Sequence, residues 1–255
     1  MKSRLMALVG GLALSSSLLF AGVGIVTATS TPASTGPSGK GVCATEFAAI
    51  KPTATGAALI AFGNCEINRR FVTLGDLSAK ITASKVMTSS DKAALQAEIS
   101  STRSGLTSLK ATIDSWTGAT GIPALKADIV DIATEFRVYL LVTPQVNLVN
   151  AADAVLATQT RFATVNTNLT ARIAAAKAAG KDTTAAQADL NAMNASVTAA
   201  VALAQPLPAF LLPLTPAQYN AQPTILASAR TALGQARDDL KSAVADALAC
   251  RDALK

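Results

Sequence analysis

The stretch 95–116 carries the feature that most constrains the fold of this chain. Its inward-type residues recur at alternating steps of four and three: Leu95, Ile99, Thr102, Leu106, Leu109, Ile113 and Trp116. On an α-helix this spacing places all seven side chains along one face. Half of the residues are hydrophobic but only 4% are aromatic, which favours closely packed Ala- and Leu-rich helices over strands. The sequence therefore predicts an all-α fold, an elongated antiparallel helical bundle.

Apolar spacing predicts five helical stretches. They cover residues 64–87, 88–116, 123–179, 184–205 and 223 to near the C-terminus. Thr88 is the expected N-cap of the second stretch, with Asp91 placed to reach back toward it. Residues 206–223 contain five prolines and cannot form one regular helix. Because this stretch is apolar, we expect it to cover the bundle. The side chains expected to be buried there are Phe210, Leu211, Leu212 and Tyr219.

The third stretch, 123–179, contains a single proline, Pro144, and a change of apolar register around it. The row before the proline is Leu125, Ile132, Tyr139 and Val146, and the row after it is Leu148, Val155, Phe162 and Leu169. The first row would continue to Asp153 and Thr160, which are polar. A shift of two residues turns the apolar face of a helix by about 200°. The pattern predicts one helix, kinked at Pro144, whose apolar side changes midway.

This change of face predicts two three-helix modules that share the kinked helix. The first module covers residues 43–143, including an N-terminal disulfide loop, and the second covers 144–255. For the segment "FRVYLLVTPQVNLV" (136–149) a buried strand is the alternative, because its residues have high β-propensity. Where the modules meet, one hypothesis is a hydrophobic pocket, and ordinary core packing is its alternative. The residues that would line this junction pocket are Phe136, Tyr139, Val146 and Leu211.

The N-terminus has the three parts of a secretory signal peptide. Two basic residues precede an apolar run over 5–26, and small residues follow at Val26-Thr27-Ala28. Residues 1–28 are therefore the predicted signal peptide, and an uncleaved membrane anchor is the alternative because the run is nearly long enough to span a bilayer. Residues 29–42 are rich in Ser, Thr, Pro and Gly, which predicts a flexible linker.

Export makes a disulfide possible among the three cysteines. Cys43 and Cys65 bracket a segment of about twenty residues, and closing such a loop could stabilise the fold by about 3 kcal/mol. Cys250 falls on an apolar row of the last helix with Ala229, Ala236 and Ala243, where a free cysteine acts as a small hydrophobic residue. We favour a Cys43–Cys65 bond with Cys250 reduced.

Several classes of function find little support in the composition. The formal net charge of +6, which falls to +4 without the two basic residues of the signal peptide (20 basic against 16 acidic), comes with no basic run, so nucleic-acid binding is not expected. The chain has no His, the commonest general base and metal ligand. The acidic pairs Asp128/Asp131 and Asp238/Asp239 are interpreted as solvated charges. We therefore expect no catalytic residues, no metal and no cofactor.

Two segments, "DKAALQAEISSTRSGLTSLKATID" (91–114) and "FRVYLLVTPQVNLVNAAD" (136–153), resemble a group of exported proteins. These are uncharacterised Ala-rich, coiled-coil-like helical proteins of actinobacteria and related bacteria. The similarity covers the chain from about Cys65 onward. It implies the same export and the same helical body, and it brings no activity and no site residues.

These observations favour an exported, non-enzymatic helical protein that is secreted or lies in the cell envelope. It would act as a spacer or protein-interaction module, with a protein partner in the envelope and membrane contact only through an uncleaved N-terminal segment. The alternative is an exported binding protein for an apolar small molecule or lipid. A hydrolase is disfavoured by the lack of His and of facing carboxylates.

Overall fold

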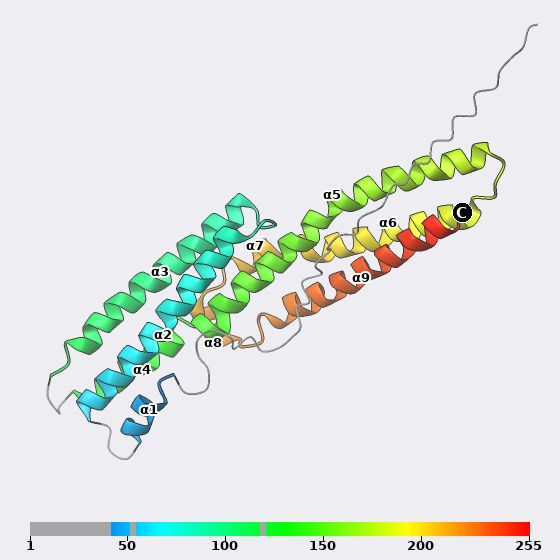
Figure 1. Cartoon of the computed structure of the whole chain (residues 1–255). Helices are drawn as coiled ribbons and strands as arrows, with labels where there is room; N and C mark the ends of the chain where they lie inside the picture. Colours follow the sequence, from blue (N-terminus) through cyan, green and yellow to red (C-terminus); the bar gives the residue numbers. More distant parts are fainter. Residues whose placement is uncertain (1–41, 52–54, 118–120) are drawn as a thin grey trace, which may run out of the picture.

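The computed structural model describes residues 42–51, 55–117 and 121–255, and within these ranges the chain forms helices and no strand (Figure 1). The predicted all-α class is confirmed. The predicted signal peptide (1–28) and all of the predicted linker (29–42) except its last residue lie outside the described residues. The helices are α1 (Ala44–Ile50), α2 (Gly56–Ala83), α3 (Ser89–Asp114), α4 (Ile122–Thr134), the π-helical turn η1 (Val138–Val142), α5 (Thr143–Ala178), α6 (Thr184–Ala204), α7 (Leu207–Leu211), α8 (Pro216–Ala221) and α9 (Ala227–Asp252).

The molecule is elongated, and its long helices run roughly along its length (Figure 1). At one end α2, α3 and α4 contact one another, and α1 packs beside α2. At the other end α5, α6 and α9 contact one another. The short helix α7 packs against α5 near the middle of the molecule.

α3 forms as its sequence predicts. Thr88 is its N-cap, and its Oγ1 accepts a hydrogen bond from the Asp91 N–H at 3.1 Å. Five of the seven predicted inward side chains are buried, and Leu109 and Trp116 are partly buried against the same core. The carboxylate of Asp91 does not complete a capping box, because the Thr88 N–H donates instead to Asp153 Oδ2 at 3.2 Å.

The first long helix, α2, begins and ends earlier in the sequence than the predicted range 64–87. Its N-cap is Thr55, whose Oγ1 accepts from the Ala58 N–H at 3.2 Å. Helices α1 and α2 therefore cover most of the segment between Cys43 and Cys65, for which no helix before residue 64 is predicted. At the other end Ser84 leaves the helical region with ψ of 130°, and its Oγ accepts from the Met87 N–H at 3.2 Å. This local turn ends α2 at Ala83.

The prediction of a single helix over residues 123–179, kinked at Pro144, is wrong, because the helix is interrupted before the proline. α4 ends at Thr134, and Arg137 adopts a left-handed backbone conformation with φ of 42°, which interrupts the right-handed helix. The π-helical turn η1 follows and leads directly into α5. Pro144 lies in the first turn of α5. Because an N–H is not needed within the first turn of a helix, the proline is tolerated there, and the interruption precedes it.

The short helix α8 holds this interruption in place. The side chain of Asn220 donates to the Thr134 carbonyl oxygen at 3.0 Å and accepts from Arg137 Nε at 2.5 Å. The Arg137 guanidinium also lies 5.7 Å from the centre of the Tyr219 ring. An orphan carbonyl at the end of α4 is thereby satisfied by a side chain far away in the sequence.

The predicted shift of the apolar face at Pro144 is also wrong in its position. Asp153, expected on the outside, is only 2% exposed, whereas Thr160 is exposed as predicted. Between Leu141 and Val155 the buried residues occupy several sides of the helix: Leu141, Val142, Gln145, Val146, Val149, Ala152, Asp153 and Val155. The chain here runs through the centre of the molecule, so packing partners surround it and polar side chains are enclosed together with apolar ones.

The proline-rich stretch 206–223 forms two short helices, α7 and α8, rather than one regular helix, as predicted. Leu211 is fully buried, and Leu212 and Tyr219 are partly buried. The expectation for Phe210 is wrong, because its side chain is 38% exposed. Leu207 and Leu211 share the inner face of α7 at a spacing of four, which turns the intervening Phe210 away from it.

Buried apolar residues form two clusters. The larger one extends from α2, α3 and α4 through η1 into the first half of α5, the end of α6, α7 and the start of α9. The smaller one joins the far ends of α5, α6 and α9: Leu169, Ile173, Ala186, Leu190, Met193, Ala243, Ala247 and Cys250. The larger cluster lies on both sides of residue 143, where the boundary between the two modules is predicted.

Two helical stretches, Ile122–Ala178 and Thr184–Leu211, are long and apolar enough to cross a membrane by length and composition. Both supply residues to the buried clusters described above. Core helices of a water-exposed bundle meet the same length and hydropathy criteria.

Candidate interaction site

The helix α2 has two faces with the same spacing and different surroundings. Its inner face consists of Gly63, Ile67, Arg70, Leu74, Leu77 and Ile81, all buried. Its outer face consists of Ala61, Cys65, Asn68, Val72, Gly75 and Ala79, of which all but the partly buried Cys65 are exposed. Both sets follow steps of four and three, which is coiled-coil spacing. α2 therefore presents a second packing face to the surface, with Val72 49% exposed on it.

A disulfide joins α1 to this outer face. Cys43 and Cys65 are bonded with a Cα–Cα distance of 5.9 Å, so the predicted pairing is confirmed. Cys250 is the free, buried cysteine, as predicted, on the same fully buried row as Ala229, Ala236 and Ala243. Burial raises the pKa of the Cys250 thiol, which keeps it protonated and unreactive. The disulfide indicates an oxidising, exported environment.

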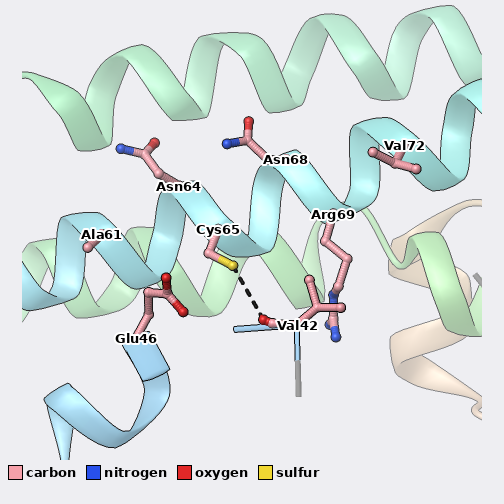
Figure 2. Close-up of a pocket in the computed structure, with 8 residues that line it drawn as sticks. All are labelled: Val42, Glu46, Ala61, Asn64, Cys65, Asn68, Arg69 and Val72. Carbon is pink, nitrogen blue, oxygen red and sulfur yellow. Dashed lines mark hydrogen bonds between the residues drawn. The ribbon is translucent and has the colours of Figure 1, made fainter. Parts of the chain in front are cut away.

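A shallow groove of about 460 Å³ lies between α1 and the outer face of α2 (Figure 2). Its lining residues are Val42, Glu46, Ala61, Asn64, Cys65, Asn68, Arg69 and Val72. Cys65 Sγ lies 3.7 Å from the Val42 carbonyl oxygen, which is a packing contact because a disulfide sulfur carries no hydrogen. The groove is widely open to solvent. It combines exposed apolar side chains with amides, the Arg69 guanidinium and the Glu46 carboxylate, a composition suited to another protein surface.

A cluster of charged side chains, Arg69, Arg70 and Glu66, lies at one edge of this face. Arg69 and Arg70 both donate to Glu66 Oε2, so two guanidinium groups share one carboxylate. Their charged ends lie 4.9 Å and 5.1 Å from the centre of the Tyr139 ring. Both Nε atoms and the Tyr139 hydroxyl are buried without a hydrogen-bond partner in the described chain. The cluster of Arg69, Arg70 and Glu66 therefore carries one unbalanced positive charge next to an aromatic ring.

The residues of the hypothesised junction pocket all lie in the larger core cluster or pack against it. Val146 and Leu211 are fully buried in the larger core cluster. Phe136 packs over Gly105 of α3, where a Cβ atom would lie 2.5 Å from its ring, and Tyr139 lies under the arginines of α2. Core packing thus accounts for all four side chains. None of them lines the groove beside the disulfide.

A buried amide beside these residues was not singled out from the sequence. Gln145 is 1% exposed, and its Nε2 donates to the carbonyl oxygens of Leu211 at 2.6 Å and Leu214 at 3.2 Å. This side chain gives the Leu214 carbonyl a donor and adds a second donor to the Leu211 carbonyl, which also accepts from the Leu214 N–H at 3.2 Å. A glutamine in an otherwise apolar stretch, facing a proline-rich segment, is the signal that could have indicated it.

A second missed feature is a row of polar side chains on α5 that holds the α2–α3 turn. Asn147 accepts from Lys80 at 2.6 Å, Asn150 accepts from Ser84 at 2.7 Å, and Asp153 accepts from the Thr88 N–H. The spacing of three residues along α5 places them on one face. Burial and the nearby Asp91 raise the pKa of Asp153 to about 6, the hydrogen bond from Thr88 acting in the opposite direction.

The carboxylates considered from the sequence have structural partners. Asp128 accepts from Trp116 Nε1 at 2.8 Å, which ties the end of α3 to α4. Asp238 accepts from Lys241 at 2.8 Å, and this contact lowers the pKa of Asp238. Among the residues that the structure describes, no three His, Cys, Asp or Glu side chains are grouped to hold a metal ion.

The features that remain without a structural explanation are thus the outer face of α2, the open groove beside the disulfide and the cluster of Arg69, Arg70 and Glu66. All three lie on one side of α2, in the part of the molecule that the disulfide joins to the N-terminal segment. Comparisons of the chain with protein-family models, with curated proteins and with solved structures find no match.

Proposed function

We propose that the protein is an exported, non-enzymatic helical spacer and protein-interaction module of the cell envelope or extracellular space. In this proposal residues 1–28 direct export, residues 29–42 form a linker, and the body consists of two three-helix modules, 43–143 and 144–255. The disulfide between Cys43 and Cys65 and the elongated all-helical shape support it. A disulfide at the start of the folded body would protect the point where a linker joins it.

The single observation that carries the proposal is the exposed outer face of α2. A helix that is packed on one side usually carries charged and polar residues on the opposite face. Asn68, Val72, Gly75 and Ala79 lie on this second face, all of them exposed and none of them charged. Exposed uncharged faces next to a charged edge are typical of surfaces that bind another protein.

Site-specific crosslinking in the native cell envelope tests this function. A photoreactive amino acid replaces Val72 on the outer face or, as the matched control, Val130, which is 57% exposed on α4. We expect a discrete crosslinked protein product from position 72 and none from position 130. Equal labelling from both positions, or no product from either one, would contradict the proposal.

A second candidate function is binding of an apolar small molecule or lipid. The groove beside the disulfide favours it, because its volume of about 460 Å³ is in the range of ligand sites and Val42 and Val72 line it. An environment-sensitive lipophilic dye should then bind saturably to the purified protein, and Val72→Asp should weaken this binding. Dye fluorescence that rises without saturation would exclude this second function.

A further inference from the structure

We infer that the outer face of α2 binds the α2 helix of a second copy of this chain, in antiparallel orientation. This inference rests on the proposed function and names the partner of the same surface. The chemistry required of the partner is an uncharged helical face with complementary charges on one edge. α2 itself supplies both.

The shape of the outer face fits a second helix at close range. Asn68, Val72, Gly75 and Ala79 are exposed and follow the steps of four and three that bring one side of a helix against a partner helix. Three of the four are apolar or lack a side chain. A Cβ atom built on Gly75 would have no neighbour within 4 Å, so the surface is open there.

An antiparallel two-fold pairing fills that open space. If Val72 of one copy lies opposite Gly75 of the other, the two-fold axis repeats the same contact with the roles exchanged. Asn68 of each copy then lies opposite Ala79 of the other. The largest side chain of the face is thereby matched with the residue that has none, and the amide is matched with a methyl group.

Charge selects the antiparallel orientation and the same register. When two helices run in opposite directions, the same edge of each helix meets along the seam, and the edge in question carries Arg69 and Asp76. In the register set by Val72 and Gly75, Arg69 of one copy lies beside Asp76 of the other, and this pair also forms twice. Asp76 is exposed and has no ion-pair partner in the described chain, whereas Arg69 belongs to the cluster with one unbalanced positive charge.

A parallel pairing would lose these contacts. It would place the edge with Arg69 and Asp76 against the opposite edge of the second helix. The residues on that opposite edge are Asn64, Phe71 and Ser78, none of which is charged. The distribution of charge around α2 therefore favours the antiparallel arrangement specifically.

Sedimentation velocity of the purified, disulfide-intact chain over a range of concentrations tests self-association. We expect a concentration-dependent dimer that weakens as salt is raised. Asp76→Arg, at an exposed position, should weaken the dimer about tenfold. Adding Arg69→Asp in the same chain should restore it, because the charges are then exchanged. Lys126→Asp, at an exposed position of α4, is the matched control and should leave the dimer affinity unchanged.

Cysteine crosslinking tests the orientation. Mixing the Asn68→Cys variant with the Ala79→Cys variant should give a disulfide-linked dimer under mild oxidation, whereas Asn68→Cys alone should not, since eleven residues of helix separate the two copies of that position by about 16 Å. A chain that stays monomeric, or an Asn68→Cys dimer, would overturn the inference. If a monomeric chain still crosslinks another protein from position 72 in the envelope, the proposed function stands and only self-association fails.

Discussion

At the scale of single residues, the glycines within helices and at the N-cap of α4 differ in what surrounds them. Gly234 in α9 has nothing within 4 Å of a built Cβ atom. Gly105 in α3 lies under Phe136, with a built Cβ atom 2.5 Å from its ring, and Gly121 lies even closer to Trp116. Close packing of aromatic rings onto helix backbones explains the last two positions. Gly234 has no such role.

Gly234→Ala should therefore stabilise the fold by about 0.5–1 kcal/mol, because alanine loses less backbone entropy in a helix. Gly105→Ala should destabilise it by about 1–3 kcal/mol through overpacking against Phe136. Chemical unfolding followed by circular dichroism measures both. In a Phe136→Ala background the cost of Gly105→Ala should disappear, and a cost that persists would show that the ring is not its cause.

The burial of Asp153 makes the folding stability of the protein depend on pH. Its pKa rises from the usual 3.8 to about 6 in the folded protein, with burial as the main cause and Asp91 as the nearby acidic group. Folding therefore favours its protonated form. The contribution of Asp153 to the free energy of unfolding is fully present below about pH 3.8 and is lost as the pH rises through about 6.

Asp153→Asn should remove this dependence while keeping an oxygen that can accept from the Thr88 N–H. The variant should be more stable than the natural chain at pH 8, by on the order of 2–3 kcal/mol, and about equally stable at pH 4. Unfolding free energies at both pH values measure the difference. Asp246→Asn on α9 serves as the control, and an equal effect of both substitutions would contradict a specific role for Asp153.

At the scale of elements, the start of α5 is the point where three features of the fold meet. The π-helical turn η1 directly precedes α5, and Pro144 lies in the first turn of α5. The Gln145 side chain donates to carbonyl oxygens at and just after the end of α7. In the wider π-helical turn the Val138 carbonyl accepts from the Thr143 N–H and also from Thr143 Oγ1, the latter at 2.8 Å. Gln145 thereby becomes the link between α5 and the proline-rich segment.

Gln145→Leu should destabilise the protein by about 1–2 kcal/mol, although leucine fills a similar volume. The loss comes mainly from the buried carbonyl oxygen of Leu214, because the Leu211 carbonyl keeps the Leu214 N–H as a donor. Hydrogen exchange should show faster opening of α7 than of α3. Gln96→Leu, which removes side-chain bonds at the partly buried Ser78, is the comparison, and it should cost less.

At the scale of the whole molecule, the two ends have cores of different kinds. The larger cluster is rich in Leu, Ile and Val side chains, which come from the first half of α5 and from the helices packed around it. The smaller cluster at the far ends of α5, α6 and α9 depends on three alanines and a few larger side chains. A core of small side chains buries less apolar area, so it stabilises its end of the molecule less.

The far ends of α5, α6 and α9 should accordingly exchange their amide hydrogens at a lower opening free energy than α2 and α3. Met193→Ala, in the smaller cluster, should create a cavity that destabilises this end by about 2–5 kcal/mol. Hydrogen exchange should then be faster at this end and unchanged in α3. Leu106→Ala in the larger cluster should act on the molecule as a whole. Uniform exchange along the chain would contradict this division.

Local sequence determined much of this protein because helix formation depends on near neighbours. The spacing over 95–116, the Thr88 cap, the alanine row ending at Cys250 and the disulfide segment all involve residues close in sequence or repeated along one helix. Each could be read without knowing the fold. The outer face of α2 also follows from residue spacing, yet its exposure does not, because only the assembled bundle shows which of two equivalent faces is covered.

Tertiary structure alone decided the features that depend on distant partners. Arg137 keeps its left-handed conformation where Asn220 of α8 bonds both sides of the break, so the sequence around Pro144 pointed to the wrong residue. Asp153 is buried because the α2–α3 turn supplies the Thr88 N–H. Local patterns assign polar residues to the outside and prolines to kinks. A long-range hydrogen bond changes both assignments, since it satisfies a buried polar group that would otherwise need water.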